Sequence, residues 1–124
     1  MQNRIFSGAP TEAKAGYARA VIDGDLIWHS GTIGFDPETG ALPPDLESQL
    51  VNIFRIIESS LSEAGARLAD VKHCRVYITG MDGFETVAAM LRAKLGDVRP
   101  ANTTVISALV VPGALVEIEV VARR

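Results

Sequence analysis

The sequence has few of the side chains from which metal sites, disulfides and nucleic-acid surfaces are built. Its 124 residues include one cysteine and two histidines. Cys74 therefore has no internal disulfide partner, which fits a reducing compartment. Twelve lysines and arginines stand against fifteen acidic residues, for a net charge of −3. Without a basic excess there is little counterion release to drive binding to phosphate backbones, so we expect no nucleic-acid partner.

Long hydrophobic runs are also missing. The longest uncharged stretch, residues 100–116, is interrupted by Pro112 and Gly113, which predicts two strands and a turn instead of a membrane span. Residues 1–8 hold no apolar run of signal-peptide length. The apolar share of 48% and the charged share of 22% are typical of globular proteins. We therefore expect one soluble, cytoplasmic domain over residues 1–124, with no membrane partner.

The first half of the chain alternates in steps of two. Residues 4–7, 17–23 and 26–33 are expected to be strands, and the Asp-Gly pair at 23–24 is typical of a hairpin turn between the last two. In strand 26–33, strict alternation places Ser30 and Thr32 on the face of Trp28, and Gly31 on the face of His29.

A helical period then replaces the alternation. Apolar residues recur every three or four positions from 46 to 64, between a suitable N-cap at Asp45 and a suitable C′ residue at Gly65. After a predicted strand at 71–78, a second apolar stripe over 84–95 indicates another helix, for which Asp82 and Glu85 form a possible capping box. Strands at 103–111 and 115–122 complete the order β-β-β-α-β-α-β-β.

This order predicts an α+β fold, a mixed sheet with both helices on one face, because strand–helix–strand crossovers are nearly always right-handed. Residues 103–111 are apolar on both faces of their strand. Two helices cover one side of a sheet, so the other side is left as a large exposed apolar patch. We therefore expect an oligomer that buries the second face.

Few side chains are arranged for catalysis or metal binding. His73 and Cys74 are neighbours on a strand and point to opposite faces, so they form no dyad, and no third ligand stands at metal spacing. His29 is better explained as a hydrogen-bonded structural residue than as a base. Residues 31–34 resemble a GxxG loop but lack flanking lysine or arginine, and glycines that end a strand and allow another backbone to approach explain them better.

Glu117 and Glu119 are the most informative pair. They alternate with apolar residues, so both project from one face, about 7 Å apart by the strand rise. A carboxylate pair at this spacing serves acid–base chemistry, and it equally suits the solvated face of an edge strand. Burial of this face between subunits would favour a role in acid–base chemistry, because a desolvated carboxylate is typical of functional sites.

Several short runs, taken together, resemble the RidA/YjgF superfamily of reactive intermediate deaminases, also described as L-PSP endoribonuclease-like. The resemblance covers residues 17–124 and rests on YARAV at 17–21, SG at 30–31, DPETG at 36–40, EAG at 63–65, LADV at 68–71, VYIT at 76–79 before Phe84, RPAN at 99–102 and PGALVEIE at 112–119. It implies a chorismate-mutase-like fold, a homotrimer and clefts between subunits.

The resemblance also implies an activity. Active members hydrolyse imines and enamines to carbonyl compounds and ammonia without a metal or cofactor. By matching positions, Glu117 is the catalytic residue that orders the water. The substrate-binding residues are then Tyr17, Ser30, Gly31, Asn102 and Thr104.

One departure concerns the substrate anchor. The family's arginine after Pro-Ala is Asn102 here, which offers hydrogen bonds but no charge. An asparagine common on the second helix is also replaced, near Ala88. The natural substrate is therefore expected not to be a standard 2-imino acid, unless Arg19 or Arg99 replaces the missing charge.

Three functions remain open at this point. The first is a hydrolase acting on a small imine or enamine, with water held by Glu117. The second is a non-catalytic trimer that binds a small molecule or a partner in the same cleft. The third is the ribonuclease of the older family description, which the acidic chain disfavours.

Overall fold

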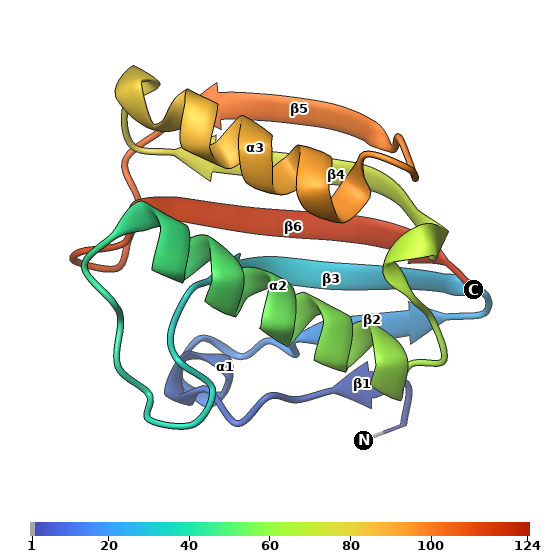
Figure 1. Ribbon diagram of the computed structural model, residues 1–124. Coiled ribbons are helices and arrows are strands. Elements are labelled where there is room, and N and C mark those ends of the chain that lie inside the picture. The colour runs from blue at the N-terminus through green and yellow to red at the C-terminus, as the bar shows by residue number, and fades with distance from the viewer. Residues whose placement is uncertain (1) are drawn as a thin grey trace.

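The computed structural model describes residues 2–124; Met1, the first residue of the expected domain, lies outside the described residues. Six strands form one mixed sheet in the order β1-β2-β3-β6-β4-β5, with the two long helices on one face (Figure 1). The strands are β1 (Arg4–Ile5), β2 (Ala20–Asp23), β3 (Leu26–Ile33), β4 (Val71–Ile78), β5 (Ala101–Ile106) and β6 (Val116–Arg123). The helices are α1 (Pro10–Ala15), α2 (Leu46–Glu63) and α3 (Phe84–Leu95), and short 3-10 turns cover Leu68–Asp70 and Met81–Gly83.

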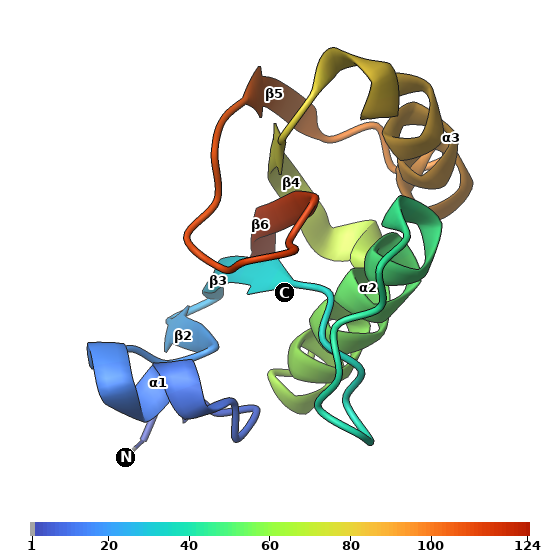
Figure 2. The same ribbon diagram turned by 90° about the vertical axis from the view of Figure 1, so that its left-hand side faces the viewer.

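The expected mixed α+β sheet with two helices on one face is confirmed. β5 runs parallel to β4, and the other neighbours are antiparallel. Seen along the sheet, α2 and α3 lie on one side, while α1 and the loop after β5 lie on the other (Figure 2). The side away from α2 and α3 is called the open face below.

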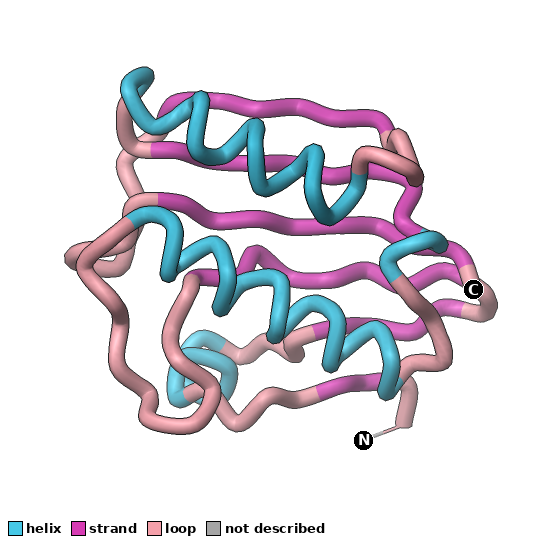
Figure 3. The backbone as a smooth tube through the Cα atoms, in the orientation of Figure 1, coloured by secondary structure: helices cyan, strands magenta, loops and turns pink. Residues whose placement is uncertain are grey.

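The end of the chain differs from the two strands expected at 103–111 and 115–122. β6 lies between β3 and β4, so β5 and β6 are not neighbours. β5 ends at Ile106, level with the last residue of β4, Ile78. Beyond that point no neighbouring strand continues the ladder, and residues 107–115 return across the open face as a loop instead of extending the strand to 111 (Figure 3).

The beginning of the chain also differs. The alternating pattern predicted a strand from residue 17, but β2 begins at Ala20, and a short helix, α1, precedes it. Pro10 occupies the first turn of α1 and Gly16 ends the helix with φ 74°. This is the usual asymmetry of proline at the start of a helix and glycine after its end, which strand periodicity could not reveal.

The N-terminal caps predicted for α2 and α3 compare differently with the structure. Asp45 caps α2 as predicted, its carboxylate accepting from the backbone N–H of Ser48 at 2.9 Å, and Gly65 follows the helix with φ 81°. The capping box at the start of α3 was wrong. Asp82 lies in a 3-10 turn that runs directly into the helix, and the N-cap position, Gly83, is already helical with no side-chain cap.

A bulge in β3 corrects the expected alternation. Its ladder with β6 pairs His29 with Val120 and Thr32 with Ile118, so the register shifts between them. One extra residue reverses the faces of the residues that follow it. Thr32 is therefore buried on the helix side with His29, and Gly31 belongs to the open face.

The core lies between the sheet and α2. Four fully buried residues of α2 pack against the sheet: Leu50, Ile53, Ile57 and Leu61. On the open face, Trp28 is 50% exposed, Val105 39% and Val110, in the returning loop, 94%. This is the apolar second face that the sequence analysis expected.

Candidate functional site

A cavity of about 450 Å³ opens at one end of the open face. Four of the six residues that the resemblance assigned to the site line it: Tyr17, Ser30, Gly31 and Glu117. The segments on either side of α1 and the loop at 110–111 supply much of the remaining wall. The cavity is therefore built by three segments that are distant in sequence and meet at the bulge of β3.

The Glu117 carboxylate is the central acidic group of this cavity. β6 presents Glu117 level with Ile33 of β3 and Tyr77 of β4, and the bulge brings Gly31 directly beneath its carboxylate. Among the described residues, no hydrogen bond or ion pair holds this carboxylate. Burial raises the pKa of Glu117, the nearby charge of Glu119 raises it further, and Arg19 opposes both.

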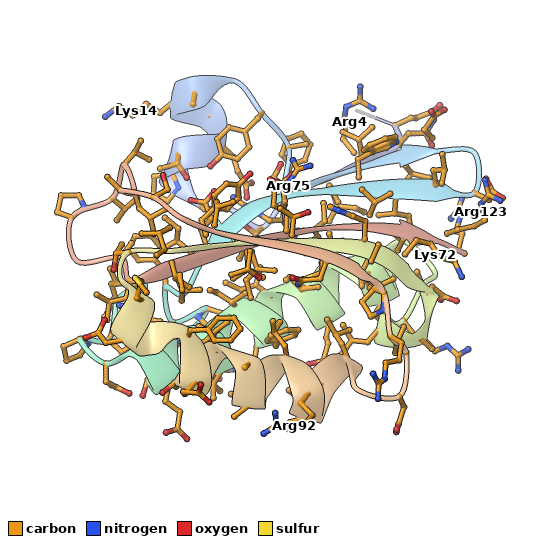
Figure 4. All side chains as sticks on the ribbon, turned by 90° about the horizontal axis from the view of Figure 1, so that it is seen from above. Arg4, Lys14, Lys72, Arg75, Arg92 and Arg123 are labelled. Carbon is orange, nitrogen blue, oxygen red and sulfur yellow. The ribbon has the colours of Figure 1, made fainter. Side chains whose placement is uncertain are left out.

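Glu119 differs from Glu117 although both project from the open face, as predicted. The Tyr77 hydroxyl donates to the Glu119 carboxylate, and the Arg75 guanidinium stands 3.7 Å away. Arg75 lies on the same side of the sheet as α1, opposite the helix that carries Arg92 (Figure 4). Glu119 is thus a partnered surface carboxylate, whereas Glu117 is free to act on a ligand or a water molecule.

Arg19 is a cavity residue that the sequence analysis considered but did not assign. It is 4% exposed. Its Nε donates to Glu12 at 3.0 Å and its Nη1 donates to the carbonyl of Gly31 at 2.8 Å. The guanidinium carbon also lies 5.4 Å from the centre of the Tyr17 ring. Arg19 therefore ties α1 to the bulge on which Glu117 rests.

Glu12 was missed because α1 was missed. Burial would raise the pKa of Glu12, but hydrogen bonds from Ser7 and Arg19 outweigh this and hold it below its ordinary value. Tyr17, just after α1, donates its hydroxyl proton to Thr11 in the first turn of the helix at 2.9 Å. The proline at 10 and glycine at 16 were the available sequence signal for this helix.

Asn102 and Thr104 lie elsewhere in the chain. Their β5 positions are level with Cys74 and Val76, on the helix-facing side of the sheet, and the Thr104 hydroxyl donates to the Asn102 side chain at 2.9 Å. Asn102 instead lines a separate hollow beside α3 together with Arg99. Within one chain neither residue reaches Glu117, so their place in the cleft stays a prediction that requires a second chain.

The remaining titratable candidates are buried structural residues. His29 shares a 2.9 Å hydrogen bond with the carbonyl of Ser30 through Nδ1. Its Nε2 has no partner among the described residues, and burial lowers its pKa to about 4. Cys74 is buried too, and burial raises its pKa to about 11.

Two other features are absent from residues 2–124. No three acidic, histidine or cysteine side chains gather there as metal ligands. None of the helices in this range has the length and apolar character of a membrane span.

The chain matches known proteins over nearly its whole length. The profile of the family described as Endoribonuclease L-PSP matches residues 7–124. The chain belongs to this family, within the RidA/YjgF superfamily. A RutC family protein of Aquifex aeolicus is 33% identical over 108 residues, covering 86% of each chain.

Solved structures and named enzymes agree with the assignment. A member of the YjgF/YER057c/UK114 family from Mycobacterium tuberculosis is 36% identical, covers 98% of each chain and superposes with a TM-score of 0.88. A protein of Salmonella typhimurium named 2-iminobutanoate/2-iminopropanoate deaminase is 28% identical, over 87% of each chain. The expected RidA/YjgF membership and fold are therefore confirmed.

Proposed function

We propose that this protein is a RidA-like hydrolase that deaminates a small imine or enamine, with Glu117 positioning the attacking water. The observation that carries the proposal is the unpartnered Glu117 carboxylate in a mostly apolar cavity. Its pKa is raised chiefly by burial, and a desolvated carboxylate of this kind is typical of groups that exchange protons with a substrate. The relatives named as imine deaminases support the same reaction class.

The reaction needs little from the protein beyond positioning and proton transfer. Water adds to the carbon of the C=N bond while Glu117 accepts a water proton. Glu117 then returns this proton to the carbinolamine nitrogen. As the C–N bond breaks and the C=O bond forms, Glu117 accepts the hydroxyl proton and passes it to the departing ammonia, which leaves as ammonium.

The substrate in this proposal is not a standard 2-imino acid. Asn102 stands where the resemblance implies an arginine, and an amide cannot neutralise a carboxylate. Thr104, which bonds Asn102, accompanies it on β5. Both residues would line the cleft only if β5 of a second chain packs beside the cavity.

A homotrimer with clefts between subunits is part of the proposal. The exposed Trp28 and Val105 on the open face support it, because such side chains are commonly buried between copies. The lone buried Cys74 suits the reducing cytoplasm as the site of action.

Ammonia release from freshly generated imines tests the activity. We expect Glu117→Gln to lower kcat/KM by a factor of about 10² to 10⁴, the usual contribution of a general base. Glu58→Gln, which removes a carboxylate from the outer surface of α2, is the matched control and should retain activity. Equal rates for Glu117→Gln and the wild type would refute the role of Glu117.

The variant Asn102→Arg distinguishes 2-imino acids from other imines as the substrate. If Asn102→Arg gains activity on 2-imino acids while the wild type hydrolyses other imines, the cleft is assembled as proposed and lacks the carboxylate anchor. Efficient wild-type turnover of 2-iminobutanoate would contradict the substrate proposal.

A non-catalytic binding trimer is the second candidate, and Asn102 favours it because the charged anchor is missing. A small molecule that raises Tm and is recovered unchanged would support binding without turnover. We do not extend the ribonuclease activity in the family description to this chain, because its net charge of −3 opposes phosphate binding.

A further inference from the structure

Two charged side chains line the cavity, Arg19 and Glu117, and the charge selectivity of the cavity depends on which of them a ligand can use. Arg19 has five N–H donors. Nε donates to Glu12, Nη1 donates to the Gly31 carbonyl at 2.8 Å and the Thr32 hydroxyl at 3.3 Å, and Nη2 points to the Tyr17 hydroxyl at 3.4 Å. The protein itself therefore occupies most of the hydrogen-bonding capacity of Arg19.

Glu12 also neutralises the charge of Arg19. The two side chains are 4% and 5% exposed and form an ion pair of 3.0 Å. The Glu12 carboxylate further accepts from the backbone N–H groups of Ser7 and Gly8, at 3.0 and 3.3 Å, and from the Ser7 hydroxyl. These donors keep Glu12 ionised, so an anion that approaches Arg19 meets the opposing field of Glu12 behind it.

Within residues 2–124, Glu117 has no such partner, and the negative charge of the neighbouring Glu119 adds to its own. Arg75 approaches Glu119 to 3.7 Å, but at the surface, where Arg75 is 46% exposed and weakly effective. Most of the remaining wall is apolar or uncharged, including Ala15, Phe35 and Val111. The cavity thus presents one unpaired carboxylate in an apolar setting.

We propose that the cavity selects a small organic cation, a protonated imine or a primary ammonium with an apolar substituent, and rejects carboxylates, because Glu12 neutralises Arg19 and leaves Glu117 as the charge that a ligand meets. The selection of a protonated imine as the reacting ligand rests on the proposed function. The balanced reaction is R₂C=NH₂⁺ + H₂O → R₂C=O + NH₄⁺. The ligand is a cation beside ionised Glu117 at the start and at the end of this reaction, and the charge pair is absent only while Glu117 holds a proton.

Three ligands of the same shape and different charge test the selectivity without turnover. Isobutylammonium, isobutyramide and isobutyrate are titrated into the full chain at low salt and neutral pH, and their Kd values are read from chemical-shift changes. We expect the wild type to bind isobutylammonium at least about tenfold more tightly than isobutyrate, which corresponds to one well-desolvated charge contact. Equal binding, a preference for isobutyrate, or no binding of the ammonium overturns the proposal.

Two variants assign the preference to its cause. Glu117→Gln should remove the advantage of isobutylammonium while the Kd of neutral isobutyramide stays within about twofold. Glu12→Gln should release the Arg19 charge and strengthen isobutyrate binding, whereas Glu38→Gln, a change in an exposed ion pair, should leave all three ligands unaffected. If Glu12→Gln does not fold, the wild-type and Glu117→Gln series decides the question alone.

The binding experiments test the cation selectivity, and the turnover experiments test the proposed function, so each proposal can be refuted without the other. Cation binding without hydrolysis of any imine would refute the proposed function and keep the selectivity. Glu117-dependent hydrolysis of anionic 2-imino acids, with no binding of isobutylammonium, would refute the selectivity and the substrate proposal and keep the hydrolase activity of Glu117.

Discussion

The carboxylate of Glu117 packs against Gly31, in the space that a side chain at position 31 would fill. A Cβ at position 31 would stand 3.0 Å from Cδ of Glu117 and closer still to Oε2. The carboxylate can approach this closely because the bulge of β3 turns a residue without a side chain toward the open face. Gly31 thereby sets the depth at which Glu117 sits in the cavity.

Gly31→Ala should therefore impair function while the fold persists. The new methyl group meets the end of a flexible side chain, so we expect Glu117 to swing outward and imine hydrolysis to fall by at least about tenfold, with Tm changed by a few degrees. Gly34→Ala is the contrasting change. Its Cβ would meet the backbone of Gln49, 2.6 Å from Cα, and should destabilise the fold instead. Full activity of Gly31→Ala would show that the contact has no functional role.

Arg19→Met should be strongly destabilising because it leaves the buried Glu12 without its cation. Breaking one partner of a buried ion pair costs about 3 to 5 kcal/mol, and the free energy of unfolding from urea titration measures it. The double variant Glu12→Gln with Arg19→Met removes both charges and should recover part of the loss. A single variant within about 1 kcal/mol of the wild type would contradict a buried, essential pair.

His29 should make the fold less stable as pH falls below neutrality. Its pKa is about 4 in the folded protein, chiefly because of burial, and 6.5 in its ordinary state. The unfolded chain therefore binds more protons between these pH values, and stability decreases on acidification through this window by an amount on the order of 3 kcal/mol.

The measurement is the difference in unfolding free energy between the wild type and His29→Gln at several pH values. The difference is needed because the raised pKa of Glu117 acts in the opposite sense in the same range. Below about 4.5, the lowered pKa of Glu12 adds its own loss. An unchanged slope for His29→Gln would contradict the prediction.

Gln49 should control the loop that forms one wall of the cavity. Its fully buried side chain donates to the carbonyls of Pro43 and Gly113, at 2.8 and 3.0 Å, and accepts from the N–H of Leu115 at 2.9 Å. Gln49→Leu removes all three hydrogen bonds from these half-buried backbone groups and should cost about 1 to 3 kcal/mol. Hydrogen exchange at the Leu115 amide should accelerate, and unchanged protection there would show that other contacts hold the loop.

Val105→Lys should dissociate the proposed trimer. Val105 is 39% exposed on the open face, while Val51 is 44% exposed on α2, on the other side of the molecule. Sedimentation equilibrium should give three times the 13.2 kDa chain mass for the wild type and for Val51→Lys. A charge at Val105 would be buried in the interface, so that variant should sediment as a smaller species. Monomeric wild-type protein would refute the trimer.

The sequence alone determined the local features of this protein. Asp45 and Gly65 marked the ends of α2, because capping and the left-handed backbone are properties of single residues and their neighbours. Period two placed Glu117 and Glu119 on one face of β6. The order of short motifs carried the family, and the apolar residues 103–111 predicted an exposed second face.

Tertiary structure decided how these features combine into a site. β6 inserts between β3 and β4, a long-range pairing that no local period records. The bulge at residues 30–31 follows from that pairing and reverses the face of Gly31. The ion pair between Glu12 and Arg19 exists because α1 packs beside the bulge. Local propensity fixes where an element begins and ends, but burial and charge depend on neighbours distant in sequence, and these decide that Glu117 is the free carboxylate of the cavity.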